Sequence, residues 1–387
     1  MQFAHLARVE SSATLTINSL VLKKKAAGER VYNLNAGEPI MPAPEAVIEA
    51  VLKAMREGKT QYPPVAGIPE LRSAAVEWMN LKSQTEYRLE QCLITCGGKF
   101  GLYALFQALL NPGDEVLLAA PYWVSYPSLV RIFGGLPKIV STMETSGWKV
   151  TVNALEKLVS PRTKIVIINN ATNPTGALYN RSELKDILAF AEAHDLLVIS
   201  DEVYSGLVYD NNEFISSGSF TEYQDRVVVV ESCSKHFAMT GWRVGLVFGP
   251  KEIIDILTTI QSQSTSGTAS ISQWAALAAF RQAEVLASNL RAEMQRRRNA
   301  LVNALASAFQ PAPPSPPASL YLFVSLKALG VDEQNSAVFC ERLLDQAGVA
   351  LAPGAAFGQD GYVRFSFGDT IHNLEAGARA LYTFLRK

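Results

Sequence analysis

The stretch RVVVVESCSKHFAMTGWRVGLVFG, residues 226–249, contains two apolar runs with a polar segment between them. RVVVVE and GLVFG have the length and the branched or aromatic side chains of β-strands. Between them stand Lys235, flanked by small residues, and Arg243, in a glycine-framed segment. Taken alone, Lys235 would be a solvated loop charge and Arg243 a charge at a strand edge, because isolated basic residues are mostly exposed. The rest of the chain decides whether the two share a ligand.

Short β-branched runs alternate with amphipathic helical patterns between about residues 45 and 280. The strand-like runs are QCLITC, DEVLLAA, TKIVIINN, LLVIS, RVVVVE and GLVFG, and the helical patterns include KFGLYALFQALL and RSELKDILAFAEAH. This alternation predicts an α/β fold with a mostly parallel sheet covered by helices on both faces. The following long helical stretch, with the strand-like runs LYLFVSL and GYVRFSFG, predicts a separate α+β unit.

The composition favours a small-molecule partner. The 387 residues allow more than one domain, and 35 basic against 36 acidic residues give a net charge of -1, without a basic field for nucleic acid. No apolar run is long enough to span a membrane, and the start has no signal-peptide core, so we expect a cytoplasmic protein. Four scattered histidines and four cysteines without paired spacing predict reduced thiols and no metal site.

Polar residues follow four of the strand-like runs. LITC leads into Gly97, Gly98 and Lys99; IVIINN into Asn173; LLVIS into Asp201 and Tyr204; and VVVVE into Ser232, Ser234 and Lys235. Ligands of open parallel sheets bind at the carboxyl ends of the strands. If these runs lie in one sheet, a carboxylate, an amide, a phenol and an amine meet in one crevice.

Each of these residues also has a simpler explanation. Gly97–Lys99 could be a tight turn rather than a phosphate cup at a helix N-terminus, Asp201 a helix N-cap and Asn173 a turn residue. Trp123, in APYWVSYP, could pack in a core or an interface rather than stack on a planar ligand. Arg364, in GYVRFSFG, either lies on the solvated face of its strand or binds a carboxylate as a bidentate fork.

One cofactor uses all of these groups together. Pyridoxal 5′-phosphate (PLP) needs a lysine for its Schiff base, an acid at its ring nitrogen, donors to its phenolate oxygen and a phosphate cup. Lys235 would be the amine and Asp201 the acid, and the Asn173 amide could donate to the phenolate. Tyr204 could donate to the same oxygen, because one helical turn would place it on the side of Asp201.

Six motifs in order give the chain a family resemblance. NAGEP, YPPVAGIPELR, PYWVSYP, NNATNPTG, SDEVY and SCSKHFAMTGWRVG resemble the motifs of class I aminotransferases of PLP fold type I, closest to the bacterial aspartate aminotransferases. The resemblance implies a large domain, 46–285, with a mostly parallel seven-stranded sheet. It also implies a small domain, 286–387, which the N-terminal segment 1–45 joins, and a homodimer with shared active sites.

The resemblance implies a role for each strand-end residue. Lys235 carries the Schiff base and moves the substrate Cα proton, and Asp201 pairs with the ring nitrogen. Tyr204 and Asn173 contact the phenolic oxygen. Trp123 is expected to stack on the ring, the phosphate to meet Gly98, Lys99, Ser232, Ser234, Arg243 and Tyr62 of the neighbouring subunit, and the substrate to meet Gly37, Lys99, Trp123, Asn173 and Arg364. His236 gains no role and is expected to be structural.

Lys99 carries the prediction of substrate. It stands where a lysine of similar enzymes meets the distal carboxylate, which favours L-aspartate as donor and 2-oxoglutarate as acceptor in a ping-pong reaction. As a point charge, Lys99 could instead serve the phosphate alone. Similar enzymes often have GEPDFDTP where this chain has GEPIMPAP, residues 37–44, which argues against prephenate. The alternatives are an aromatic or methionine aminotransferase, a C–S β-lyase, or a PLP-binding regulatory protein.

Overall fold

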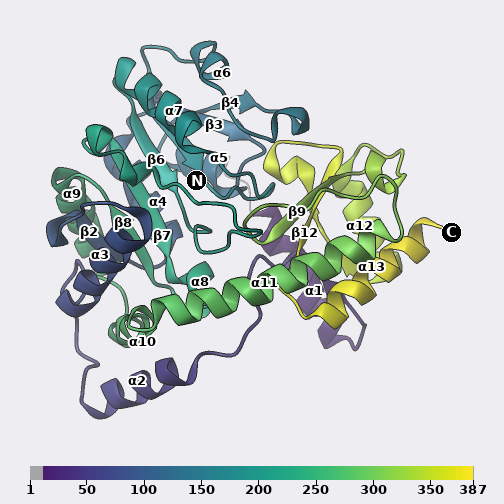
Figure 1. Ribbon diagram of the computed structural model, residues 1–387, viewed down its shortest axis with the longest axis horizontal. Helices are drawn as coiled ribbons and strands as arrows, with labels where there is room; N and C mark the ends of the chain where they lie inside the picture. Colours follow the sequence, from purple (N-terminus) through teal and green to yellow (C-terminus); the bar gives the residue numbers. More distant parts are fainter. Residues whose placement is uncertain (1–11, 387) are drawn as a thin grey trace, which may run out of the picture.

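The computed structural model describes residues 12–386, in which a seven-stranded sheet with helices on both faces lies beside a smaller α+β unit (Figure 1). The strand order of the large sheet is β2-β8-β7-β6-β5-β3-β4. Its strands are β2 (Cys92–Thr95), β3 (Glu115–Ala120), β4 (Leu136–Ser141), β5 (Thr163–Asn169), β6 (Leu197–Asp201), β7 (Val227–Ser232) and β8 (Gly245–Phe248). The predicted α/β class and the number of strands are confirmed.

The sheet is mostly parallel, but β8 runs antiparallel to both of its neighbours. The connection from β7 to β8 contains only the four-residue helix α8 (Cys233–His236) and a 3₁₀ turn. Because no helix there is long enough to cross the sheet, the chain turns back beside β7. Ser232, the last residue of β7, therefore pairs with Gly245, the first residue of β8. The two ends of the segment that carries Lys235 thus lie side by side at the carboxyl end of β7.

The sequence pattern identifies six of the seven strands and misses β4. This strand, LPKIVS, lies at the edge of the sheet, and Val140 is its one buried residue. It also contains Pro137, which an edge strand tolerates because one row of its backbone groups needs no partner. A half-exposed edge strand lacks the continuous apolar run by which the inner strands are recognised.

Helices cover both faces of the sheet. They are α3 (Pro69–Ser83), α4 (Gly98–Leu109), α5 (Ser125–Ile132), α6 (Val152–Glu156), α7 (Arg181–Ala193), α9 (Lys251–Ser264) and α10 (Ser270–Phe280). A further helix, α2 (Glu45–Arg56), packs against α10. Alternate residues of β7 point to opposite faces: Val228 and Val230 pack with α4, α5 and α9, whereas Val227 and Val229 pack with α3, α7 and α10. Burial on both faces explains the unbroken valine run.

The smaller unit joins the N-terminal segment to the C-terminal part of the chain. Its elements are α1 (Ala13–Ala26), β1 (Tyr32–Asn33), α11 (Ala283–Ala306), β9 (Tyr321–Ser325), α12 (Ser336–Ala347), β10 (Val349–Ala350), β11 (Ala352–Pro353), β12 (Tyr362–Ser366) and α13 (Ile371–Leu385). β1 pairs with β10, and β11-β12-β9 form an antiparallel sheet. The long helix α11 runs from the end of α10 to this unit (Figure 1). Within residues 12–386, no helix combines the length and apolarity needed to cross a membrane.

Gly245 supplies a stability prediction, because β8 lies tightly against the turn before α4. A Cβ at Gly245 would stand 2.3 Å from the carbonyl carbon of Gly97 and 2.4 Å from the nitrogen of Gly98. Backbone atoms cannot rotate away as a side chain can, so Gly245→Ala is expected to lower the free energy of unfolding by about 2–3 kcal/mol. Urea denaturation measures this change.

Gly241→Ala is the matched control for that variant, because no atom of the described residues, apart from Gly241 and its two chain neighbours, lies within 4 Å of its Cβ position. Its free energy of unfolding is expected to stay within about 0.5 kcal/mol of the parent. Equal stability of the two variants would contradict the steric argument.

Candidate active site

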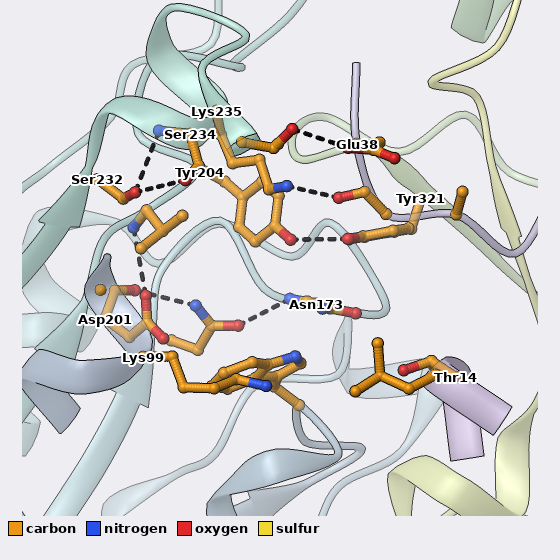
Figure 2. Close-up of a pocket in the computed structure, with 18 of the residues that line it drawn as sticks. Thr14, Glu38, Lys99, Asn173, Asp201, Tyr204, Ser232, Ser234, Lys235 and Tyr321 are labelled. Carbon is orange, nitrogen blue, oxygen red and sulfur yellow. Dashed lines mark hydrogen bonds between the residues drawn. The ribbon is translucent and has the colours of Figure 1, made fainter. Parts of the chain in front are cut away.

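The predicted site residues meet in one cavity of about 380 Å³ at the carboxyl ends of β5, β6 and β7 (Figure 2). The cavity is lined by Gly37, Gly98, Lys99, Trp123, Asn173, Asp201, Tyr204, Ser232, Ser234, Lys235, Arg243 and Arg364. Tyr62 is the one predicted residue that does not line it, and its side chain is 92% exposed. Strand ends far apart in sequence thus supply a single site, as parallel topology requires.

Lys235 lies in α8, directly after β7, and its amine points across the cavity (Figure 2). Nζ donates a hydrogen bond of 2.5 Å to the carbonyl oxygen of Gly37. Burial lowers the pKa of Lys235 to about 8, although the nearby carboxylate of Glu38 opposes this effect. An appreciable fraction of the amine is therefore neutral near pH 7, which a nucleophile or a base requires.

Asp201 ends β6 and is buried. The hydroxyl of Tyr126 donates to its Oδ2 at 2.6 Å, and the backbone N–H of Val203 donates to Oδ1 at 3.3 Å. Burial raises the pKa of Asp201 to about 6, even though both hydrogen bonds lower it. No cationic side chain within residues 12–386 forms a salt bridge with this carboxylate. It is therefore suited to a cationic ligand group.

The predicted helical turn after Asp201 is wrong, because residues 203–206 form turns without a helix. The same finding removes the alternative of Asp201 as a helix N-cap. Tyr204 nevertheless faces the same cavity, and its hydroxyl lies 2.7 Å from that of Tyr321 (Figure 2). Burial keeps the pKa of Tyr204 well above its usual value, so the phenol remains a hydrogen-bond donor.

Arg364 is buried in β12, not on a solvated strand face. Its Nη1 donates to Oδ1 of Asn173 at 3.0 Å, and its Nη2 donates to the carbonyl oxygen of Asn35 at 2.8 Å. Nε has no partner within the described part of the chain. Because the oxygen of Asn173 accepts from Arg364, the amide NH₂ of Asn173 is left as a donor. The pair thus offers a buried cation beside an amide donor.

The N-terminus of α4 forms the other end of the cavity. No side chain caps this helix, so backbone N–H groups of its first turn can meet an anion. Gly97 has a φ of +81°, and a Cβ there would stand 2.4 Å from Nη2 of Arg243. The hydroxyls of Ser232 and Ser234 lie 2.8 Å apart beside it. A glycine, a cation and two hydroxyls therefore surround a helix N-terminus, the arrangement that a phosphate requires.

Residues 29–381 match the family model for class I and II aminotransferases. The chain belongs to this family. The aspartate aminotransferase of Geobacillus stearothermophilus is 36% identical over 388 residues, covering 98% of each chain. The aspartate/prephenate aminotransferase of Thermus thermophilus is 38% identical over 383 residues, covering 98% of this chain and 96% of the relative. The structure of the T. thermophilus aspartate aminotransferase with maleate has a TM-score of 0.92 at 36% identity, covering 99% and 98% of the two chains.

This aminotransferase is PLP-dependent and has fold type I, as predicted. The chemistry of the cavity fits the cofactor. The buried Asp201 carboxylate lacks a cation and suits a protonated ring nitrogen, and the uncapped N-terminus of α4 with Arg243 suits a phosphate. The orphaned Nε of Arg364 suits a substrate carboxylate. The contacts of the individual residues with cofactor and substrate stay predictions.

Several residues of the aminotransferase site were not predicted from the sequence. Tyr126, the partner of Asp201, lies in the quoted motif PYWVSYP, where its position three residues after Trp123 was the only signal. Tyr321 lies in the strand-like run LYLFVSL, whose apolar pattern indicates only a buried strand. Thr14 and Asn35 come from the N-terminal segment: Asn35 begins the quoted motif NAGEP, whereas Thr14 lies in none of the quoted motifs.

Asp201→Asn is expected to stabilise the cofactor-free aminotransferase at neutral pH. The pKa of this carboxyl is raised from 3.8 in the unfolded chain to about 6 in the folded one. Ionisation of the buried group therefore does not lower the free energy of unfolding below about pH 4, lowers it increasingly between about pH 4 and 6, and lowers it by a constant amount above that. Asparagine can accept from Tyr126 without a charge. The variant should be more stable than the parent by about 3 kcal/mol above pH 7 and equally stable near pH 4. Urea unfolding at both pH values tests this, and a pH-independent gain would exclude the charge as its cause.

Proposed function

We propose that this aminotransferase transfers the amino group of L-aspartate to 2-oxoglutarate. The observation that carries the proposal is that Arg364 and Lys99 line one cavity without an ion pair to any carboxylate of the described residues. Nζ of Lys99 stands 4.8 Å from the ring centroid of Trp123. A substrate with two carboxylates can engage both cations. The names of the relatives from G. stearothermophilus and T. thermophilus include aspartate, and maleate is itself a dicarboxylate.

Substrate binding in this proposal begins at Arg364, which holds the α-carboxylate. The hydrogen bonds to Asn173 and to the carbonyl of Asn35 keep the guanidinium in one orientation. Lys99 meets the distal carboxylate, and burial and the charge of Arg243 both lower its pKa, so an anionic partner stabilises its protonated form. Trp123 and Gly37 flank the substrate between the two cations.

Proton transfer in this proposal belongs to Lys235. PLP, when bound, stabilises the negative charge that develops at the substrate Cα. The Lys235 amine, with a pKa of about 8, would accept the Cα proton and deliver it to a carbon of the cofactor rather than back to Cα. Asp201 holds a proton at the ring nitrogen, and Tyr204 and Asn173 donate to the phenolic oxygen. The backbone N–H groups of Gly98 and Lys99 and the side chains of Ser232, Ser234 and Arg243 would hold the phosphate.

A homodimer completes the proposed site. Tyr62 is 92% exposed and lies outside its own cavity, which suits a side chain that reaches the phosphate in a second copy. Ile48, Leu52 and Met55 are also exposed. Their spacing places them on one face of α2, a helix that stands away from the large sheet (Figure 1). Such an apolar face supports a subunit contact.

An assay of donors and acceptors tests the substrate. Aspartate and 2-oxoglutarate are expected to yield oxaloacetate and glutamate. Faster turnover of phenylalanine or methionine would favour an aromatic or methionine aminotransferase, and pyruvate with ammonia from cystathionine would identify a C–S β-lyase. Prephenate belongs in the same panel, because the stretch 37–44 argues against its use.

Lys235→Ala is expected to abolish transamination and leave the fold unchanged. Alanine has no amine to bind the cofactor or to move the proton. The measurement is oxaloacetate formation, with circular dichroism as the test of folding. Lys235→Arg is the matched control: it retains a cation that cannot be deprotonated and is expected to be inactive as well. Substantial turnover by either variant would refute the role of Lys235.

Lys99→Ser is expected to raise the KM for aspartate by about tenfold or more, because a hydrogen bond to a charged group is lost. The KM for phenylalanine, which has no distal carboxylate, should change much less. Steady-state kinetics with both donors at saturating PLP separate the two effects. An equal rise for both donors would assign Lys99 to the phosphate instead.

A further inference from the structure

An ionic cluster that is buried except for the partly exposed Lys82 lies behind the active site. It consists of Lys82, Ser205, Glu231 and His236. Nζ of Lys82 lies 3.0 Å from Oε1 of Glu231, and Nε2 of His236 lies 2.8 Å from Oε2 of the same carboxylate. The hydroxyl of Ser205 donates to Glu231, accepts from Lys82 and lies 3.0 Å from Nε2 of His236. None of these four residues lines the active-site cavity.

Two chain segments carry both the cavity residues and the cluster residues. After β6, Tyr204 lines the cavity, whereas its neighbour Ser205 belongs to the cluster. Around α8, Lys235 lines the cavity, whereas His236, the next residue, turns to the cluster beside Glu231. A displacement of the cluster residues would therefore move the residues that face the cofactor.

The cluster holds one charge pair rather than several free charges. Lys82 and His236 lower the pKa of Glu231 to about 2 despite burial, so Glu231 is ionised and pairs with Lys82. Burial lowers the pKa of His236, so its neutral ring donates Nε2–H to the carboxylate. Burial raises the pKa of the neighbouring Glu202 to about 7, so this second carboxyl is largely protonated below neutral pH. Displacement of Lys82 or His236 would leave the fully buried Glu231 carboxylate without one of its partners, which holds the pair in place.

One aromatic ring of α3 packs against the cluster from outside. The ring of Trp78 lies 4.4 Å from Nζ of Lys82 and packs edge-on against His236 with a centroid separation of 4.9 Å. The cluster thus cross-links α3, the turn at residues 203–206, the end of β7 and α8. Its side-chain contacts add to the backbone hydrogen bond from Glu202 to Val230, which joins the start of the turn to β7.

We propose that this ionic cluster positions Tyr204 and Lys235 relative to each other at the cofactor. The inference rests on the proposed function, in which both residues contact PLP. Its four members are positioning residues, since none lines the cavity. Displacing a reacting group by about 1 Å can lower a rate by about a hundredfold, so a cluster that holds two such groups can control the rate without touching the substrate.

Three variants of the holoenzyme test the proposal. Ser205→Ala disconnects the turn that carries Tyr204, and His236→Leu removes the N–H donor from α8. Both are expected to lower kcat by about tenfold or more and change the KM for aspartate much less. Both should also weaken PLP binding and shift the pH midpoint of the visible absorbance of the bound cofactor. His236→Gln keeps an N–H donor toward Glu231 and is expected to restore most of these losses.

Glu115→Gln is the matched control. Glu115 is also a buried carboxylate, but it begins β3 at the opposite end of the sheet, where Ser160 donates to it at 2.7 Å and Arg162 at 2.9 Å. Its replacement is expected to lower the melting temperature while kcat, PLP affinity and the absorbance midpoint stay unchanged.

The outcome separates positioning from general stability. If Ser205→Ala and His236→Leu only lower the melting temperature, as Glu115→Gln does, the cluster is merely structural and the proposal is wrong. If His236→Leu does not fold, Ser205→Ala decides alone, because it removes only a hydroxyl. PLP affinity and the absorbance midpoint do not depend on the amino donor. A parent enzyme that fails to use aspartate would therefore refute the proposed substrate and leave this test intact.

Discussion

The hydrogen bond from the Lys235 amine to the carbonyl of Gly37 joins residues 198 positions apart, and both residues line the cavity. Gly37 follows β1, which pairs with β10 of the smaller unit, whereas Lys235 follows β7 of the large sheet. Arg364 makes a second link of the same kind, from β12 to Asn173 after β5. The Lys235 amine and the Arg364 guanidinium are therefore each held by a hydrogen bond from one unit to the other. The large unit supplies Lys235 and the smaller unit supplies Arg364, so both units are needed for the cations of the site.

Much of the fold follows from burial, and the parts that do not are those where burial is incomplete. The valine run of β7 predicts an inner strand because both of its faces are covered. β4 escapes recognition because Val140 is its one buried residue. The direction of β8 depends on the length of one connection, which hydrophobic periodicity does not report. The divisions at residues 45 and 285 stay predictions, since α11 passes without interruption toward the smaller unit.

The candidate site divides in the same way. Asp201, Asn173 and Lys235 could be predicted because parallel strands bring their carboxyl ends together, whatever lies between them. Tyr126 and Tyr321 could not, since their roles come from a hydroxyl meeting a particular oxygen across the cavity. The helical turn expected after Asp201 failed because its spacing argument assumed a periodicity that the chain does not adopt there. The spacing of residues along the sequence predicts which side chains meet only where the secondary structure between them is known.

In the segment from Glu231 to His236, some residues face the active-site cavity and others have only structural contacts. Ser232, Ser234 and Lys235 face the cavity, where polar groups are available to a ligand. Glu231 and His236 face the interior, where every charge needs a partner. The unpaired carboxylate of Asp201 and the desolvated amine of Lys235 both cost stability in the folded chain. The ionic cluster lies directly behind these two residues, and its hydrogen bonds hold the backbone that carries Lys235 despite this loss of stability. His236 is structural in its contacts, as expected from the sequence, and its position makes that structural role a condition for the chemistry of Lys235.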